Sequence, residues 1–512
     1  MDHPLPPPPV LHSVINTFFL CLYNRFYTCI LEAQFRQKFE TGTLPEHLLL
    51  AVLGAAIPLS TEPYYQHTRL EAARSYLSAS WTSLLKEHLP AGENGPIENP
   101  RAEIVQTCNL LGVLDWATGR PSSARLKFSI AARVGHELRL QIEPQSCLPF
   151  TEQEERRRIF WTTFILTTLY SSPKSPTFPD DECLLQLPCD EDTFRIGEWQ
   201  SMLTLGDVMA CNFQADEPPN ASCLVVLLTS AYGHCLRYAR WGEPDGQIPP
   251  WDLSSEFSQV TFLLHRVGIY YRSSSRYFLK ELRSASVSRQ MDQAHILFSR
   301  ILFHMCHCLL NHPFVMQQRL KSFDPSVGFR MRLLDDAETH AQQFLDIMGE
   351  ASQLEGFWTR EACIWPNWVA TAGSAVSLIS HIKFPEGYDK APESTQWFDR
   401  SLEVMQYLDR TLPYAAQLRD RLRDFHANHG HSFSDILNPV FPSRDVDPMI
   451  EQAFWTMIEP ARMQDAPISA DSHASQLLYW SSYTFGYTGS DRSPASSVRS
   501  RADMFKVQKS AR

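Results

Sequence analysis

The sequence predicts an all-α protein, and three observations carry the prediction. Apolar residues recur three to four positions apart through most of the chain, which is the spacing of a helix that buries one face. Proline and glycine clusters divide these periodic segments into lengths typical of helices. No run of alternating apolar and polar residues is long enough to indicate a sheet.

A single large helical domain is expected over residues 11–430, after a proline-rich lead over residues 1–10. The expected helices cover residues 11–39, 47–57, 64–89, 102–117, 124–140, 151–172, 200–213, 224–238, 257–279, 291–310, 337–348, 371–382 and 401–425. The segment 47–57 is apolar nearly all round, so we expect it to be buried. Residues 431–512 are expected to form an irregular to disordered tail, because 481–512 is rich in Ser, Gly and Arg.

The most distinctive pattern lies in residues 149–194, where a charged helix start leads into a proline-rich acidic loop. Thr151 and Glu154 have the spacing of a capping box, in which each side chain binds a free backbone N–H of the first turn. Glutamates stand four residues before Arg156 and Arg158, which is the favourable order for ion pairs along a helix. We therefore expect a solvated or ion-paired arginine face rather than a localisation signal, and prolines that end the helix near residue 172.

This ordered pattern resembles the fungal-specific transcription factor domain, the middle homology region of the fungal zinc binuclear cluster regulators. The residues that carry the resemblance are Glu155, Arg156, Arg157, Arg158, Phe160, Trp161, Pro176, Asp181, Leu187 and Pro188. Two positions depart from the family pattern, since Thr167-Thr168 replaces an Asp-Arg pair and Lys174-Ser175 replaces a Gly-Arg turn. If the Asp-Arg pair normally ties the helix to the loop, this chain lacks that tie.

Two further stretches extend the resemblance. The segments 102–117 and 124–140, joined by a Gly-Arg-Pro-Ser turn, match a helix pair of the family, although Arg139 and Gln141 replace its glycine and histidine. The residues after 291–310, Asn311-His312-Pro313-Phe314, are similar to the signature with which the family closes such a helix. The pattern of segments 102–117 and 124–140 is explained by two helices that pack in the core, and it requires no binding site.

Charge and cysteine usage limit the classes of function. A formal net charge of −11 argues against a surface that binds nucleic acid throughout, because backbone contacts come from Lys and Arg. Twelve cysteines without a Cys-x-x-Cys pair indicate reduced, mostly buried thiols rather than a disulfide framework. The N-terminus lacks a secretory signal and the apolar run 48–59 is too short to span a bilayer, so we expect a soluble intracellular protein.

The zinc cluster of the resembled family has no counterpart in this sequence. The resemblance implies DNA binding through six cysteines that hold two zinc ions, with basic residues between them. Here Cys21 and Cys29 are followed by no cysteine before Cys108. Two explanations stay open: the gene model lacks its first exon, or the chain is a natural domain-only member. We accordingly expect no cofactor, with zinc only in the absent cluster.

Two clusters suggest other chemistry. His304, Cys308 and His312 fall on one helix face, but ligands along one helix cannot surround an ion tetrahedrally without a partner from elsewhere, so we expect no metal. The acidic stretches 180–182 and 335–338 resemble the magnesium-binding motifs of all-helical terpene cyclases. Position 339 is Thr and no second motif follows, so we interpret the acids of 335–338 as helix N-terminal residues that complement the helix dipole. Serine-hydrolase, zinc-protease and nucleotide-binding motifs are absent from the sequence.

The resemblance implies a transcription factor, not an enzyme, that regulates RNA polymerase II genes in a fungal nucleus. The implied targets are genes of a metabolic or specialised-metabolite biosynthetic cluster. The expected partners are other transcription regulators, as a homodimer or heterodimer, a small-molecule inducer, and promoter DNA contacted indirectly or weakly, with no membrane. Two alternatives stay open, an all-helical enzyme of terpene-cyclase type and a helical scaffold protein.

Overall fold

The computed structural model describes residues 5–22, 29–88, 100–172, 177–196, 198, 200–210, 220–243, 248–273, 287–352, 364–382, 394–410, 412–434 and 448–465. Over these residues the chain is helical, and the only β contact is an isolated bridge between Gln186 and Thr204. The all-α prediction is confirmed. None of the described helices is long and apolar enough to cross a membrane.

The N-terminal helices pack around one buried helix. They are α1 (Pro8–Cys21), α2 (Glu32–Glu40), α3 (Glu46–Ala56) and α4 (Arg69–His88). Every residue of α3 from His47 onward is buried, as its apolar sequence predicts. The expected helix over 11–39 is wrong, because α1 ends at Cys21 and residues 29–31 are not helical. α4 begins later than expected, since Pro63 starts a separate short 3-10 helix.

The predicted helix–turn–helix pair is present. Its helices are α5 (Ala102–Ala117) and α6 (Pro121–Glu137). Both end in a motif whose residue after the C-cap has a left-handed backbone. That residue is Gly119 in α5, with a φ of 76°, and Arg139 in α6, with a φ of 52°. Leu140 N donates to Gly135 O at 3.0 Å and closes the second motif. Arg139 therefore adopts a backbone that glycine adopts without strain.

The chain then enters the centre of the molecule. The elements are α7 (Phe150–Tyr170), the 3-10 helix Asp180–Glu182, α8 (Glu191–Ile196), α9 (Leu205–Met209), α10 (Ala221–Trp241) and α11 (Glu256–Ser273). The helix expected over 200–213 is shorter, because Thr204 and Asp207 form a capping box that starts α9 only at Leu205. The side chain of Asn220 caps α10, three residues before the buried Cys223.

The following helices differ from the prediction mainly at their starts. They are α13 (Val287–Leu310), α14 (Pro313–Leu320), α15 (Val327–Ala351) and α16 (Trp365–Ser380). α13 ends at the predicted residue, but His312 then caps α14, a helix that the sequence analysis did not predict. α15 begins well before residue 337, because the side chain of Ser326 caps it by accepting from Phe329 N.

The C-terminal helices require two corrections. They are α17 (Ser394–Asp409), α18 (Pro413–Ser434) and α19 (Pro448–Ile458). The single helix expected over 401–425 is wrong, because α18 starts anew at Pro413, whose ring cannot continue a helix. The expected irregular tail is wrong for α19, where Phe454 and Trp455 are fully buried. Residues 466–512 lie outside the described residues.

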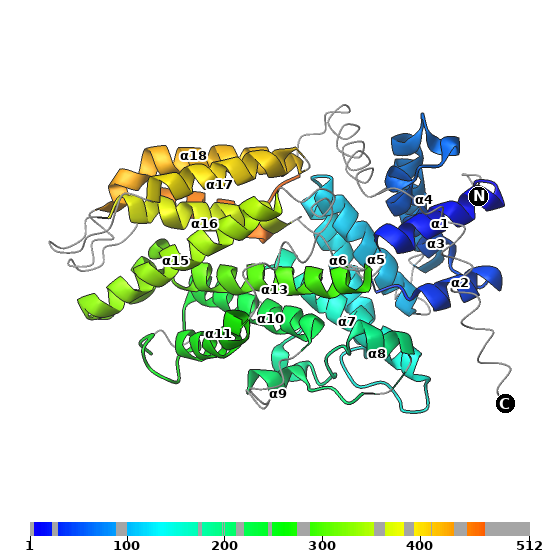
Figure 1. Ribbon diagram of the computed structural model, residues 1–512, viewed down its shortest axis with the longest axis horizontal. Helices are drawn as coiled ribbons and strands as arrows, with labels where there is room; N and C mark the ends of the chain where they lie inside the picture. Colours follow the sequence, from blue (N-terminus) through cyan, green and yellow to red (C-terminus); the bar gives the residue numbers. More distant parts are fainter. Residues whose placement is uncertain are drawn as a thin grey trace, which may run out of the picture.

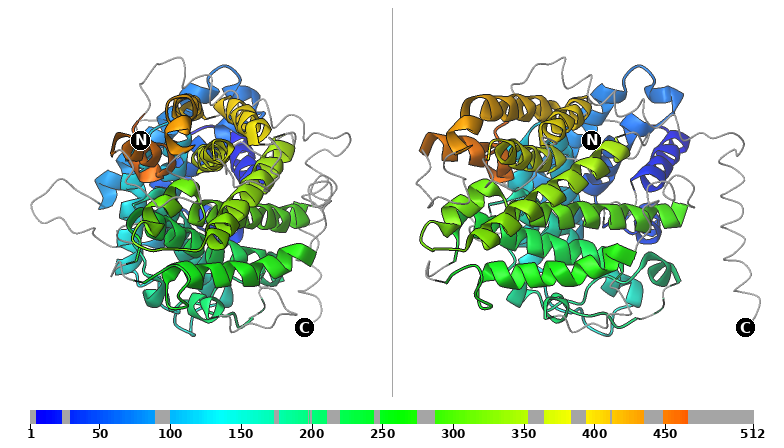
Figure 2. Two further views of the ribbon diagram at one scale, coloured as in Figure 1. Left: turned by 90° about the vertical axis from the view of Figure 1, so that its left-hand side faces the viewer. Right: turned by 60° about the vertical axis from the view of Figure 1, so that its left-hand side comes forward.

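The helices form one body around a continuous core. In Figure 1, α1–α4 lie at one end and α15–α18 at the other, with α7, α10 and α13 between them. Figure 2 shows α17 and α18 on the opposite side from α11. Buried apolar side chains form one cluster that extends along the chain from Leu11 to Met463. α7 packs against α5, α6 and α10, so the segment singled out in the sequence occupies the centre.

Candidate functional site

α7 is held in the core by its aromatic side chains. Phe160 and Trp161 are each 1 % exposed, and their rings meet edge to face with centroids 4.9 Å apart. Trp161 Nε1 donates to the carbonyl oxygen of Gln186 in the acidic loop at 2.8 Å. The predicted capping box is wrong, because the helix begins at Phe150 and no side chain caps it. This partly buried hydrogen bond and the edge-to-face contact of Phe160 with Phe178 therefore fix the loop against the helix.

Glu154 does not cap the helix and is instead the centre of a buried ionic network. Its side chain is 1 % exposed, and its carboxylate accepts from Arg158 Nε at 3.1 Å and from Arg157 Nη1 at 3.3 Å. The same carboxylate accepts the backbone N–H of Cys189 at 3.1 Å. The guanidinium of Arg157 also binds the carboxylate of Glu143, which accepts from the loop at Gln186 N. These contacts join α7, the segment before it and the loop after it.

Arg157 and Arg158 share Glu154, and each of the three arginines has further contacts of its own. The ion pair between Glu154 and Arg158 confirms one of the two pairs predicted along the helix. Arg158 also stacks on Phe194, 4.0 Å from the ring centroid, and Arg156 donates to the carbonyl oxygen of Leu138 at 3.2 Å. For Arg157 the ion-paired alternative is confirmed and the solvated one is wrong, since its side chain is only 3 % exposed and binds Glu143 and Glu154. Buried ion pairs of this kind are costly to break, since loss of one partner leaves an unpaired charge.

Glu155 links α7 to the N-terminal helices. Its carboxylate accepts from Gln106 of α5 at 3.2 Å and from Leu31 N, at the start of α2, at 3.4 Å. Burial raises the pKa of Glu155 to about 7, even though Lys38 and these donors favour the charged form. Glu155, the acid that precedes the arginines in the resembled pattern, thus connects α7 to α5 and to the start of α2.

The remaining residues of the resembled pattern lie in the loop. Leu187 is fully buried, and the carbonyl oxygen of Pro188 accepts from the Asn220 side chain at 2.9 Å. Asp181 is exposed at the rim of a cavity, and Pro176 lies outside the described residues. The described pattern residues therefore gather around α7 and its loop, mostly as packing and ion-pair contacts.

A cavity of about 300 Å³ lies between α7, the acidic loop and α10. Thr167 and Thr168 form its α7 wall, at the positions where the family pattern has Asp-Arg. The loop is tied by another pair here, because Asp180 accepts from His234 at 2.7 Å and from Ser230 at 2.7 Å. Short side chains on α7 and an ion pair between the loop and α10 thus border a space of mixed apolar and polar lining under the loop.

His234 connects the loop to α11 as well. Its other ring nitrogen lies 2.7 Å from Glu256, which also accepts from Arg237 at 2.6 Å. Burial alone would lower the pKa of His234, but the hydrogen bonds to Asp180 and Glu256 outweigh it and raise the pKa to about 9. Burial opposes the charged form of Asp180 too, yet His234 holds the pKa of that carboxyl below its usual range. Asp180, His234, Arg237 and Glu256 therefore form a network of charged side chains beside the cavity.

The side chains that the sequence placed on one metal-binding helix face have contacts with different helices. His304 Nδ1 lies 2.9 Å from His340 Nδ1 of α15, and Cys308 is fully buried. His312 caps α14 and contacts Ser374 of α16 at 3.1 Å. Each of these histidines thus has a local structural contact.

The acids of 335–338 are not at a helix start. They lie well inside α15, which begins at Val327, so the interpretation that they complement the N-terminal dipole is wrong. Burial raises the pKa of Asp336, although the positive charge of Arg332 favours its ionised form. In the acidic loop, Asp180 binds His234 rather than facing a second acidic motif.

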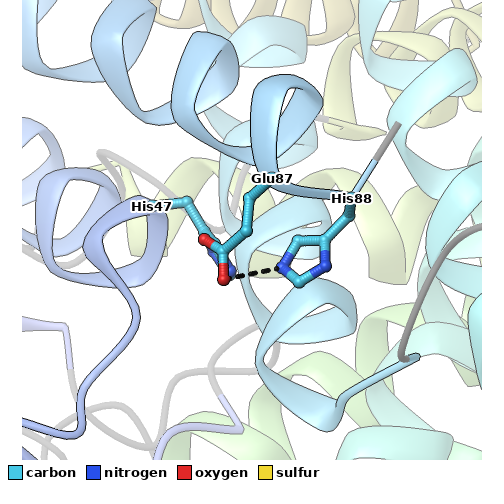
Figure 3. Close-up of side chains that lie close together, drawn as sticks. All are labelled: His47, Glu87 and His88. Atoms are coloured by element: carbon cyan, nitrogen blue, oxygen red, sulfur yellow. Dashed lines mark ion pairs between the residues drawn. The ribbon is translucent and has the colours of Figure 1, made fainter. Parts of the chain in front are cut away.

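Another group of side chains has the composition of a metal site. Within the described residues, His47 of α3 and Glu87 and His88 of α4 have ligand atoms that all lie within 4.8 Å of one another. Figure 3 shows the Glu87 carboxylate close to both histidines, in front of His47 and joined to His88 by the dashed line. The sequence analysis missed this group, because forty residues separate its two parts and no ligand spacing marks them.

Comparison with known proteins identifies the family. A sequence profile described as the fungal specific transcription factor domain matches residues 15–346. An uncharacterized transcriptional regulatory protein of Schizosaccharomyces pombe is 23 % identical over 282 residues, which cover 51 % of this chain and 28 % of that protein. The Zn(2)-C6 fungal-type transcription factor FTF1c of Fusarium oxysporum f. sp. lycopersici is 24 % identical over 205 residues, which cover 38 % and 21 %.

The chain belongs to the fungal-specific transcription factor domain family. The resemblance drawn from residues 149–194 is thereby confirmed, and the matched range also contains the helix pair α5 and α6. The chain spans less than a third of the length of either relative. Both relatives are named as transcription regulators, and this protein is likewise classed as a transcription factor by its family.

Proposed function

We propose that this protein regulates transcription of RNA polymerase II genes in a fungal nucleus, as a regulatory domain without catalytic activity. The observation that carries the proposal is the family match over residues 15–346, which includes whole the described helices from α2 to α14. The targets that we propose are genes of a metabolic or specialised-metabolite biosynthetic cluster. No cofactor or membrane takes part in this role.

The arrangement of α7 supports a regulatory role. Arg157 and Arg158 satisfy their charges on Glu154 and on the loop, inside the protein. Proteins that bind DNA present such side chains to phosphates, and the net charge of −11 opposes that use of the surface as a whole. We therefore assign promoter contact to a partner regulator, in a homodimer or heterodimer, with weak contact at most from this chain.

The cavity under the acidic loop is the space that we propose for a small-molecule inducer. Its volume of about 300 Å³ is at the lower end of the range of ligand pockets. Thr167, Thr168 and Ser230 line it, next to the charged pair of Asp180 and His234. A ligand that enters this space contacts both α7 and the loop, so it is placed to change how tightly the two are joined.

The experiment combines localisation with transcript profiling. A fungal strain without the gene is complemented with the fluorescently tagged full chain, and transcripts are compared between the two strains. The proposal expects nuclear fluorescence and a restored set of co-regulated genes that lie together in the genome.

A chain that stays in the cytosol and restores no transcripts contradicts the proposal and favours a scaffold. Magnesium-dependent turnover of a prenyl diphosphate by the purified chain, with no transcript change, identifies an enzyme instead. The matched control is the Arg156→Lys chain, since Arg156 donates to one backbone carbonyl and lies outside the Glu154 ion pairs. It should restore the same genes as the wild type.

A further inference from the structure

We propose that His47, Glu87 and His88 bind one divalent transition-metal ion, of which Zn²⁺ fits the ligand set best. The site joins the start of α3 to the last turn of α4, on the N-terminal side of the molecule (Figure 3). Imidazole and carboxylate ligands suit zinc, which in proteins commonly takes three such ligands and a water molecule. The proposal is independent of the regulatory function, because it concerns a separate layer of the fold.

The distances are close to those of a zinc site. His88 Nε2 lies 3.5 Å from Glu87 Oε1, and all three ligand atoms lie within 4.8 Å of one another. In a tetrahedral site with metal–ligand distances of about 2.1 Å, neighbouring ligand atoms are about 3.4 Å apart. The pair Glu87 and His88 already has this separation, and His47 reaches it by a small change of side-chain torsion.

The imidazole ring of His47 is held by a hydrogen bond at one nitrogen, as is typical of metal-bound histidines. Its residue is fully buried, and Nδ1 lies 2.8 Å from the Thr107 hydroxyl of α5. With Nδ1–H donating to Thr107, Nε2 is the ring nitrogen that keeps a lone pair for a metal ion. Metal-bound histidines are typically fixed in this way by a second hydrogen bond. Within the described residues, Nε2 of His47 is buried and has no hydrogen-bond partner. Buried polar atoms without a partner are uncommon, and a bound metal ion would satisfy this one.

The helices that carry the ligands are firmly connected. Ser80 of α4 donates to the backbone carbonyl of His47 at 2.6 Å, and Ser83 of α4 donates to Glu46 of α3 at 3.0 Å. The His47 and His88 rings meet at an interplanar angle of 78° with centroids 5.3 Å apart, so their nitrogen atoms approach from different directions.

The site also has an approach from solvent. The Glu87 side chain is 44 % exposed, whereas the His88 side chain is 4 % exposed. An ion can therefore enter past the carboxylate and complete its coordination with water on that side. Because the ion would bind the folded α3–α4 pair, the melting temperature of the protein should rise with metal concentration.

The test measures metal binding by the full chain after removal of any polyhistidine tag. Zinc content after gel filtration is determined by elemental analysis, affinity by competition with a chromophoric zinc indicator, and geometry by the visible spectrum of the Co²⁺ form. The variants are His47→Asn, whose amide can still reach Thr107 but lacks Nε2, and Glu87→Gln, whose half-exposed side chain tolerates the change. His67→Ala is the control, since it removes an exposed histidine just before α4.

We expect about one zinc ion per wild-type chain and the intense Co²⁺ absorption of a four-coordinate site. His67→Ala should match the wild type, and Glu87→Gln and His47→Asn should each weaken binding at least about tenfold. Thr107→Val, which removes only the orienting hydroxyl, should weaken it by about 10- to 100-fold.

Two results overturn the proposal: a wild-type chain that retains no zinc at micromolar concentrations, and equal zinc affinity in Glu87→Gln and the wild type. Circular dichroism of each variant separates loss of a ligand from loss of the fold. Because Glu87 is partly exposed, its variant decides the matter even where His47→Asn unfolds.

Discussion

Replacing Trp161 tests whether the centre of the family pattern is a packing unit. The side chain is 1 % exposed, and its ring also meets Phe164 edge to face at 5.5 Å. Truncation of a buried tryptophan costs about 3–5 kcal/mol, and loss of the bond from Nε1 to Gln186 adds about 1 kcal/mol. We expect Trp161→Ala to lower the free energy of unfolding by about 4–6 kcal/mol in total.

The expected shift of the melting temperature follows from chain length. Unfolding entropy of about 2.1 cal/mol/K per residue makes about 1 kcal/mol correspond to about 1 °C in a chain of this size. Trp161→Ala should therefore melt about 4–6 °C below the wild type in a thermal-shift assay. Trp161→Phe keeps most of the ring packing but lacks the donor to Gln186, so it should melt only about 1–2 °C lower.

Hydrogen exchange supplies a second readout. Both variants lose the bond to the loop, so amides of residues 183–190 should exchange faster in each of them. A melting temperature for Trp161→Ala within about 1 °C of the wild type would refute the packing role. Equal melting temperatures for the two variants would show that the hydrogen bond, rather than the aromatic contacts, holds the loop.

Three further predictions concern pH, backbone strain and DNA. Because the His234 pKa is raised from 6.5 to about 9, its contribution to stability is complete below pH 6.5 and fades as the pH rises through about 9. His234→Gln should thus lose on the order of 2 kcal/mol at pH 6 and almost nothing at pH 10, as measured by urea unfolding at both pH values. Arg139→Gly should stabilise the protein by about 0.5–1 kcal/mol, whereas Gly119→Ala should destabilise it by about 1 kcal/mol, as measured by thermal shift. The full chain should bind duplex DNA weakly and without sequence preference, with an affinity that falls steeply with salt and disappears when residues 491–512 are removed.

Each of these predictions has a contradicting result. A loss of stability in His234→Gln that does not change with pH would mean that the ring acts by packing and not by charge. A lower melting temperature for Arg139→Gly would mean that contacts of the arginine side chain outweigh its backbone strain. Nanomolar, sequence-selective DNA binding at physiological salt that survives removal of 491–512 would mean that a helix of the main body reads bases.

The sequence was sufficient for the fold class and for most helices, because proline and glycine mark their ends. α5 matches its predicted range at both ends, and α13 stops before Pro313 as expected. The prediction failed where one apolar pattern continued across a break, as at Pro413 between α17 and α18. It also failed at α15, which starts ten residues before the predicted position, at the cap formed by Ser326, and whose early residues Met331, Leu333 and Leu334 are already buried.

Contacts between distant segments explain the errors at the candidate site. Thr151 and Glu154 satisfy the capping-box spacing, but the helix starts at Phe150 and Glu154 turns inward to Cys189 N. Local spacing cannot reveal a partner that lies 35 positions further along the chain. Nor could it reveal His47, because the group that it forms with the end of α4 depends on how two helices pack. The resemblance to the family located α7 correctly, since it used the order of residues rather than their contacts.

The most direct test of the central claim places the full chain at a promoter by fusion to a heterologous DNA-binding domain. A reporter of intermediate basal activity in yeast detects both activation and repression. The Trp161→Ala fusion is the control, because the account ties the activity of the chain to the packing of α7. If the protein is a transcription regulator, the wild-type fusion changes reporter transcription severalfold in one direction and the variant loses much of the effect. A wild-type fusion that is expressed, nuclear and equal to the DNA-binding domain alone, with or without extracts of the metabolites of its host, would contradict the account.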